Sequence, residues 1–191
     1  MNRNLLSVRE IQNNDIESIT RYWLTADPAF LTGMGVDLSK MPSKEEWKTM
    51  LSEQLSLPYP EKKSYCMIWQ MDNEPIGHCN VNKIKFGEEA YMHLHLWNSD
   101  GRKKGMGTEL VKMSLPYFFE KLELKKIYSE PYALNPAPNK TLVKAGFTYV
   151  KEYITTPGFL NFEQPVNLWE LTYEQFNDQK LRTIPFNRNG S

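Results

Sequence analysis

The stretch that most constrains the fold is a basic, glycine-containing loop at residues 98–107, because it joins a strand-like segment to a helix-like one. Residues 91–97 before it alternate polar and apolar side chains, whereas the apolar residues after Thr108 recur at helical spacing. Glycine lets the backbone turn tightly and approach a ligand closely. The start of a helix presents unpaired N–H groups and a partial positive charge, so the loop predicts a site for phosphate groups, to which Lys103 and Lys104 add charge.

Two common phosphate-binding motifs are absent from this loop. The dinucleotide fingerprint requires Gly-x-Gly-x-x-Gly, the Walker loop requires Gly-Lys followed by Ser or Thr, and neither pattern occurs here. A glycine-containing loop before a helix is also a plain connector in many proteins. The loop by itself leaves both interpretations open, and the order of the other elements must decide between them.

The other segments alternate between helical and strand-like patterns, without an internal repeat or a dividing linker. Ser43 and Glu46 form a capping box, Pro58 stops the helix that follows, and Pro116 predicts a kink or an early end in the helix after the glycine loop. The order predicts one α/β (α+β) domain with a mixed, mostly antiparallel central sheet flanked by helices. We expect strands at residues 5–10, 65–71, 76–84, 91–97, 126–132, 147–155 and 166–172, helices at about 14–25, 44–57, 108–122 and 139–145, and an irregular loop at 27–42.

Composition narrows the remaining classes of protein. The 191 residues carry 23 basic and 23 acidic side chains, and this zero net charge gives no support for a broad nucleic-acid-binding surface. The apolar runs are too short for a transmembrane helix, and the first residues lack the apolar segment of a signal peptide. Cys66 and Cys79 lack metal-site spacing and are expected to be buried free thiols of a reducing compartment. We expect a cytoplasmic protein that binds no metal, membrane or nucleic acid.

Two motifs in this order resemble the Gcn5-related N-acetyltransferase (GNAT) family. Arg102, Gly105 and Gly107 match the family's Gln/Arg-x-x-Gly-x-Gly/Ala acyl-CoA loop. In the second motif, Gly146 stands eleven positions after Asn135, which is the spacing of that family. The similarity is closest to the branch that acetylates the N-termini of ribosomal proteins.

The resemblance implies acetyl-CoA as the donor, a primary amine (a small molecule or a protein N-terminus) as the acceptor, and direct attack in a ternary complex. It places the pantetheine arm where the sheet is splayed, between the strands at residues 91–97 and 126–132. We accordingly expect an N-acetyltransferase domain at residues 1–173 and a polar C-terminal tail at residues 174–191. The residues that the resemblance assigns to the cofactor are Trp97, Asn98, Arg102, Lys103, Lys104, Gly105, Met106, Gly107, Thr108, Asn135, Asn139 and Lys140.

The catalytic candidates lie on the two strands beside this gap. His93 and His95 share one face of their strand, and the ordinary pKa of histidine, near 6.5, suits removal of a proton from an ammonium group. The alternative is that both are packed, hydrogen-bonded strand histidines. Glu130 is the other candidate base, and its alternative role is that of an ion-paired structural carboxylate.

The positions that supply a general acid in related enzymes carry Pro138 and Leu142 here, and neither side chain can protonate a thiolate. Tyr132 or solvent would then serve, or no dedicated acid is used. The same departures favour the alternative of a non-catalytic acyl-CoA-binding or sensing module. Contacts with the acceptor are expected within residues 25–60, and the sequence leaves open the amine itself and the choice between a monomer and a homodimer.

Overall fold

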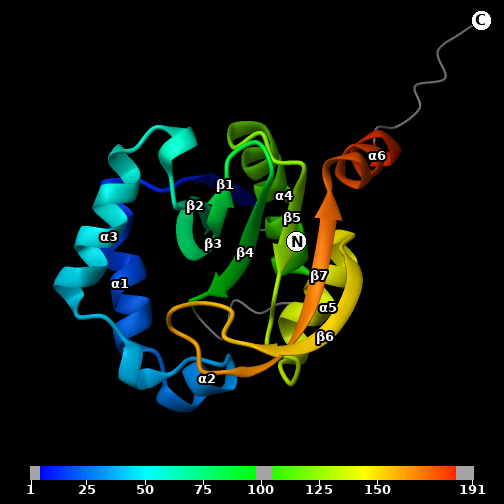
Figure 1. Cartoon of the computed structure of the whole chain (residues 1–191). Coiled ribbons are helices and arrows are strands. Elements are labelled where there is room, and N and C mark those ends of the chain that lie inside the picture. Colours follow the sequence, from blue (N-terminus) through cyan, green and yellow to red (C-terminus); the bar gives the residue numbers. More distant parts are fainter. Residues whose placement is uncertain (1–4, 98–104, 184–191) are drawn as a thin grey trace, which may run out of the picture.

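A seven-stranded sheet with the order β1-β2-β3-β4-β5-β7-β6 forms the centre of the molecule (Figure 1). The computed structural model describes residues 5–97 and 105–183. Neighbouring strands run antiparallel except β4 and β5, which are parallel, so the predicted mixed and mostly antiparallel sheet is confirmed. The strands are β1 (Leu6–Glu10), β2 (Ser64–Met71), β3 (Glu74–Lys85), β4 (Glu89–Leu96), β5 (Lys126–Ser129), β6 (Thr148–Thr155) and β7 (Gln164–Thr172).

Helices cover both faces of this sheet, and each face has its own core (Figure 1). The described helices are α1 (Ile16–Thr25), α2 (Pro28–Gly33), α3 (Lys44–Ser56), α4 (Met106–Lys121), α5 (Pro136–Ala145) and α6 (Tyr173–Thr183). On β2, Cys66 and Ile68 join the core with α1 and α3, whereas Met67 and Trp69 join the core with α4 and α5. This alternation follows from the two-residue period of a strand.

The sheet is split between its two parallel strands. β4 and β5 pair at Glu89–Lys126, Ala90–Ile127 and Tyr91–Tyr128, and beyond these pairs β4 continues to Leu96 along β3. The two strands therefore diverge after Tyr91, as the splayed sheet of the sequence analysis requires.

Residues 27–42 contain more regular structure than the irregular loop that we expected. Asp27 accepts a hydrogen bond from the N–H of Phe30 at 2.9 Å and thereby caps α2, with Pro28 in the first turn. An Asp followed by Pro is a helix start signal, and the glycines of this segment obscured it. In α4 the helix continues past Pro116 to Lys121, because buried apolar residues on both sides of the proline hold it against the sheet.

The expected polar tail begins as a helix instead. Within α6, Phe176 is only 7% exposed and stacks on Phe119 with 4.9 Å between ring centroids. Tyr173 also contacts Phe119, and Nε2 of Gln179 donates to the carbonyl of Gly146 at 3.2 Å. These contacts together hold the helix on the core, with burial of the Phe176 ring contributing about 2 kcal/mol. Residues 184–191 lie outside the described part of the chain.

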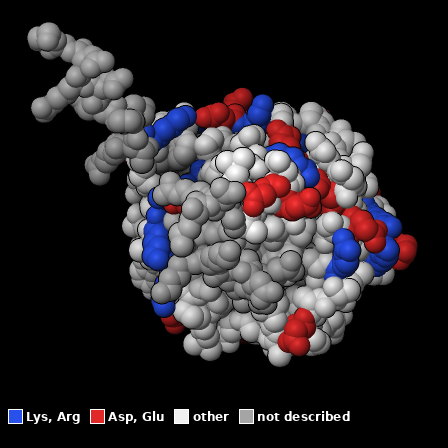
Figure 2. Space-filling model, turned by 180° about the vertical axis from the view of Figure 1, so that it is seen from behind, with Lys and Arg blue, Asp and Glu red and all other residues white. Residues whose placement is uncertain are grey.

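The surface carries acidic and basic side chains in similar measure. Figure 2 shows both kinds interspersed on the face opposite to the view of Figure 1. Within residues 5–97 and 105–183, none of the helices has an apolar stretch long enough to cross a bilayer.

Candidate active site

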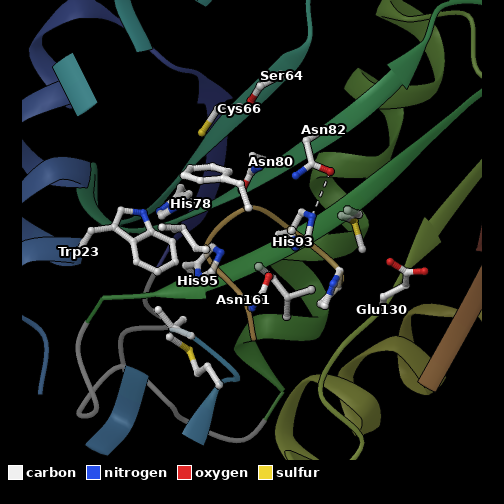
Figure 3. A pocket seen from close by; sticks show the side chains of 18 of the residues that line it. Trp23, Ser64, Cys66, His78, Asn80, Asn82, His93, His95, Glu130 and Asn161 are labelled. Carbon is white, nitrogen blue, oxygen red and sulfur yellow. Dashed lines mark hydrogen bonds between the residues drawn. The ribbon is translucent and has the colours of Figure 1, made fainter. Parts of the chain in front are cut away.

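A cavity of about 430 Å³ lies beside the split in the sheet (Figure 3). Its polar floor comes from β3 and β4, and one end reaches residues 129–132, at and after the end of β5. The opposite wall comes from α1, α3 and the loop at residues 157–161. The cavity therefore joins the split edge of the sheet to the segment, residues 25–60, in which acceptor contacts were expected.

The three histidines of the chain all line this cavity (Figure 3). His78 on β3 is the cross-strand partner of His95 on β4, and their rings stack with 4.7 Å between centroids. His93 lies two residues before His95 on the same face of β4. The sheet thus brings together the two predicted histidines and a third, and the described residues contain no group of His, Cys, Asp or Glu side chains that could hold a metal ion.

A single hydrogen bond fixes the tautomer of His93. Its Nε2 lies 3.1 Å from Oδ1 of Asn82 on β3 (Figure 3), and because this oxygen only accepts, Nε2 carries the proton. Burial, with a smaller contribution from the charge of Lys83, lowers the pKa of His93 to about 4. The imidazole is therefore neutral near pH 7, and its lone pair is on Nδ1. This pKa lies below the ordinary value near 6.5 on which the prediction rested, so the ring is free to accept a proton but is a weaker base than the sequence predicted.

His95 is held more tightly than His93. Its Nδ1 lies 3.4 Å from the hydroxyl of Tyr22, and its ring packs edge-on against Trp23 at 4.8 Å between centroids. Burial, followed by the charges of His78 and His93, lowers its pKa well below the ordinary value. These contacts match the alternative of a packed strand histidine, and they leave His93 as the better candidate for a base.

Glu130 also lines the cavity, and both of its carboxylate oxygens have donors. The hydroxyl of Tyr153 donates to Oε1, and Nζ of Lys83 lies 3.7 Å from Oε2. Burial and the carboxylate together raise the pKa of Tyr153, so its proton stays on the phenol. The carboxylate is buried and ion-paired, which is the structural role that the sequence left open for it.

The start of α4 has the shape expected for a phosphate site. Gly105 precedes the helix with φ of 94°, in the left-handed region that favours glycine. A Cβ on Gly107 would meet only Oγ1 of Thr141, at 3.9 Å, and Met106 and Thr108 are buried. The other predicted loop residues, Asn98, Arg102, Lys103 and Lys104, lie outside the described residues.

The main chain of β4 has one edge turned toward the split. Oγ of Ser129 donates to the carbonyl of Met92 at 2.8 Å across the gap. Main-chain groups of alternate residues point to the same edge of a strand, so Leu94 and Leu96 share this direction. The N–H of Trp97 instead donates to Ile76 on β3 at 2.9 Å. Sequence reasoning named Trp97 and missed Leu94 and Leu96, although the alternation of the strand was visible.

The predicted contacts on α5 have separate roles. Asn135 lines the cavity, and its Oδ1 caps the helix by accepting from the N–H of Ala137 at 3.3 Å. Asn139 is engaged within the protein: Nδ2 donates to two carbonyls, and Oδ1 accepts from Asn167 and from the indole of Trp169. Lys140 is exposed.

The two positions that carry an acid in related enzymes are occupied by apolar side chains. Leu142 is fully buried in the core, whereas Pro138 lines the cavity together with Tyr132. Tyr132 is the tyrosine among the described residues that line this cavity. The sequence analysis missed Asn80 and Asn82, which line the same cavity from β3; their spacing of two from His78 was the available signal.

A sheet split beside a helix led by glycine, with a cavity at the split, agrees with the fold of the acyltransferases that bind CoA, and the family match shows this class. Residues 6–148 match the family of the acetyltransferase (GNAT) domain, and the chain belongs to this family. The family match confirms the predictions of a GNAT fold and of an N-acetyltransferase that uses acetyl-CoA. A search of curated proteins finds no match to the chain.

Solved structures of several N-acetyltransferases have the same fold. A spermidine N-acetyltransferase from Vibrio cholerae, in complex with CoA and spermine, is 16% identical with a TM-score of 0.73, covering 90% of this chain and 98% of that one. The RimL ribosomal L7/L12 α-N-protein acetyltransferase, with CoA, is 15% identical with a TM-score of 0.71 and coverage of 87% and 93%. The aminoglycoside acetyltransferase AAC(6')-Ib, also with CoA, is 17% identical with a TM-score of 0.68 and coverage of 92% and 99%. At such identities the likeness shows the fold, and the acceptors of these proteins differ from one another.

Proposed function

We propose that this protein transfers the acetyl group of acetyl-CoA to a primary amine, either of a small molecule or of a protein N-terminus, in a ternary complex. The observation that carries this proposal is the continuity of the cavity, which runs from the split between β4 and β5 to a separate wall on α1 and α3. Donor and acceptor could therefore enter from opposite sides and meet beside His93.

The described residues fit acetyl-CoA. The first turn of α4, behind Gly105 and Gly107, offers N–H groups to a diphosphate, and the basic residues Arg102, Lys103 and Lys104 immediately precede it in the sequence. The main-chain groups of Leu94 and Leu96 offer hydrogen bonds to the amides of a pantetheine arm in the gap. Asn135 would contact the cofactor near its reactive end, where it lines the cavity.

His93 is the residue that we assign to the base. The amine nitrogen forms a bond to the thioester carbonyl carbon, the carbon–sulfur bond breaks, and CoA leaves as a thiolate. Nδ1 of His93, directly or through water, takes the proton that the nitrogen loses, and Asn82 holds the ring for this transfer. A main-chain N–H at the open edge of β4 would stabilise the developing oxyanion. The thiolate is a good leaving group and can take its proton from Tyr132 or from solvent.

The setting of the reaction belongs to the same proposal. Two free, buried cysteines, Cys66 and Cys79, suit a reducing cytoplasm. Burial raises the pKa of both thiols, so neither acts as a nucleophile near pH 7. We propose a cytoplasmic enzyme that works as a monomer or a homodimer, with an amine and acetyl-CoA as its partners.

Release of free CoA from acetyl-CoA, measured over a panel of amines and N-terminal peptides, tests the activity. We expect turnover with at least one acceptor and saturation in both substrates, with intersecting initial-velocity lines for a ternary complex. Tight binding of acetyl-CoA without turnover on any acceptor would instead support the non-catalytic module.

A further inference from the structure

The acceptor side of the cavity carries little charge. Of the described lysines, arginines and carboxylates, Glu53, Lys63 and Glu130 line it. Glu53 and Lys63 are exposed and opposite in sign, and Glu130 is neutralised by Lys83. A ligand with several ammonium groups needs several unpaired carboxylates to replace the water that it loses.

The histidines do not supply the missing negative charge, and they do not add positive charge either. Burial holds the pKa of His78 at about 3 and that of His93 at about 4, so both rings are neutral near pH 7. The indole N–H of Trp97 donates to Nδ1 of His78 at 2.7 Å, which further favours the neutral ring. The cavity can bind one amino group in its reactive, uncharged form. A further amino group of the ligand would carry a positive charge, and among the described residues the cavity offers no buried, unpaired carboxylate to pair with it.

The wall facing the histidines is aromatic. Trp23 and Trp47 stack with 5.6 Å between centroids and 10° between planes. The ring of Phe159 lies 6.3 Å from that of Trp47 and is 60% exposed, at the cavity surface. Flat apolar surfaces of this kind favour a broad, uncharged group, and aromatic pairs gain about 1 kcal/mol beyond the area they bury.

One polar group in this wall is unpaired. Trp47 is 7% exposed, and its Nε1–H has no hydrogen-bond partner within the described residues. Protein atoms enclose this nitrogen, so it offers no hydrogen bond to a ligand in the cavity. The aromatic wall therefore contributes apolar contact to a ligand.

We infer that the acceptor is a monoamine: one primary amine on an uncharged aromatic group, as in an arylalkylamine or at an N-terminal aromatic residue. This inference rests on the acetyltransferase function proposed above. It separates this protein from an enzyme for polycationic acceptors of the kind seen in the spermidine N-acetyltransferase structure.

Steady-state CoA release with tyramine, the peptide Tyr-Gly-Gly and spermidine tests the inference. We expect kcat/KM for tyramine or for the peptide to exceed that for spermidine by about tenfold or more, because spermidine lacks both carboxylate partners and an aromatic ring for this site; a tenfold ratio corresponds to about 1.4 kcal/mol. The ratio between tyramine and the peptide distinguishes a free amine from a protein N-terminus. Equal or better turnover of spermidine would overturn the inference and leave the acetyltransferase function intact.

A pair of surface variants adds a test that does not depend on the core. Phe159→Ala should raise the KM for tyramine about fivefold, with little change for spermidine. Ile154→Ala, which removes an exposed apolar side chain on β6 that does not line the cavity, is the matched control and should change neither. Equal effects of the two variants on tyramine would contradict the placement of its ring.

Direct binding separates this inference from the function on which it rests. Calorimetric titration of the CoA-loaded protein with tyramine, with the peptide Tyr-Gly-Gly and with spermidine should show the stronger affinity for tyramine or for the peptide. Binding of tyramine without turnover of any acceptor would support the inference and refute the proposed transferase activity. Absence of binding of both tyramine and the peptide Tyr-Gly-Gly would overturn the inference.

Discussion

At the scale of single residues, the contact between His93 and Asn82 decides which atom can accept a proton. The side-chain oxygen of Asn82 requires a proton on Nε2, so the lone pair lies on Nδ1 of His93. His95 has the same position on the strand face but is packed between Tyr22 and Trp23. Two histidines that are equivalent in the sequence thus have different neighbours, and only His93 fits the role of a base.

Replacing His93 should lower turnover without loss of donor binding. We expect His93→Ala to reduce kcat/KM for the amine by about 100-fold or more, with acetyl-CoA affinity nearly unchanged. Asn82→Ala should reduce kcat less, because the ring remains but is no longer oriented. Initial rates and calorimetry of acetyl-CoA binding check both variants. A kcat/KM within twofold of wild type for His93→Ala would remove this role.

The lowered pKa of His93 also fixes the form of the pH profile. The ring is neutral above a pKa of about 4, so its protonation contributes no inflection between pH 6 and 8. Over that range kcat/KM should rise with pH only as the free amine loses its proton. Rates with two amines of different pKa check this, because the inflection should follow the amine. An inflection near pH 6.5 that vanishes in His93→Ala would contradict the lowered pKa of His93 and not its role as the base.

At the scale of elements, a substitution in the first turn of α4 tests the predicted phosphate site. Gly107→Glu places a carboxylate where the diphosphate is expected and should weaken acetyl-CoA binding at least about tenfold. An acidic residue near a helix N-terminus favours the helix itself, so the variant should keep its fold. Gly107→Ala is the control, since its Cβ has room, and calorimetry should show near-normal affinity. Unchanged affinity in Gly107→Glu would refute the assignment.

The side chain of Asn139 joins α5 to its surroundings through four hydrogen bonds. Two come from Asn167 and Trp169 on β7, and two go to the carbonyls of Tyr132 and Asn135. Asn139→Ala leaves the indole N–H of Trp169 without its acceptor, and we expect the free energy of unfolding to fall by about 1–3 kcal/mol. If Asn139 instead contacts the cofactor, as the resemblance implies, the variant should lose acetyl-CoA affinity at unchanged stability. Urea denaturation and calorimetry on the same variant distinguish these two roles.

At the scale of the whole molecule, the sheet divides two cores, and the cavity lies where the sheet is split. This arrangement holds three histidines in neutral form, with His78 buried and His93 and His95 half-buried, which links stability to pH. The pKa of His78 in the folded protein is about 3, below its ordinary value of 6.5, chiefly because the ring is buried. Between these two pH values the unfolded chain binds more protons than the folded protein. The contribution of His78 to the free energy of unfolding is therefore fully present above pH 6.5 and decreases as the pH is lowered.

The protein should accordingly become less stable on mild acidification. His78 alone contributes a loss of about 2 kcal/mol between pH 6.5 and 5, at about 1.4 kcal/mol per pH unit for each proton. His78→Asn, which keeps an acceptor near the indole of Trp97, should show a smaller loss over this interval. Urea denaturation at pH 7 and pH 5 measures both proteins. Equal losses would show that His78 does not bind the proton.

Much of the fold could be predicted from local patterns. The alternation on β4, the capping box at Ser43 and the glycines before α4 each predict an element from residues close together in the chain. The helix at α2 and the docking of Phe176 were missed for different reasons. The first is a short helix among glycines, and the second depends on a partner, Phe119, that is distant in the sequence.

The sequence by itself determined the family, because its two motifs combine short glycine and asparagine patterns whose geometry is local. Only the tertiary structure decided the roles of the candidate residues. Burial and hydrogen-bond partners come from strands and helices far apart in the chain. They place Glu130 in an ion pair with Lys83 and Asn139 in hydrogen bonds with β7. The same long-range packing sets His93 apart from His95 and lines the cavity mainly with uncharged groups, because a neighbour's charge and exclusion of water act through space rather than along the sequence.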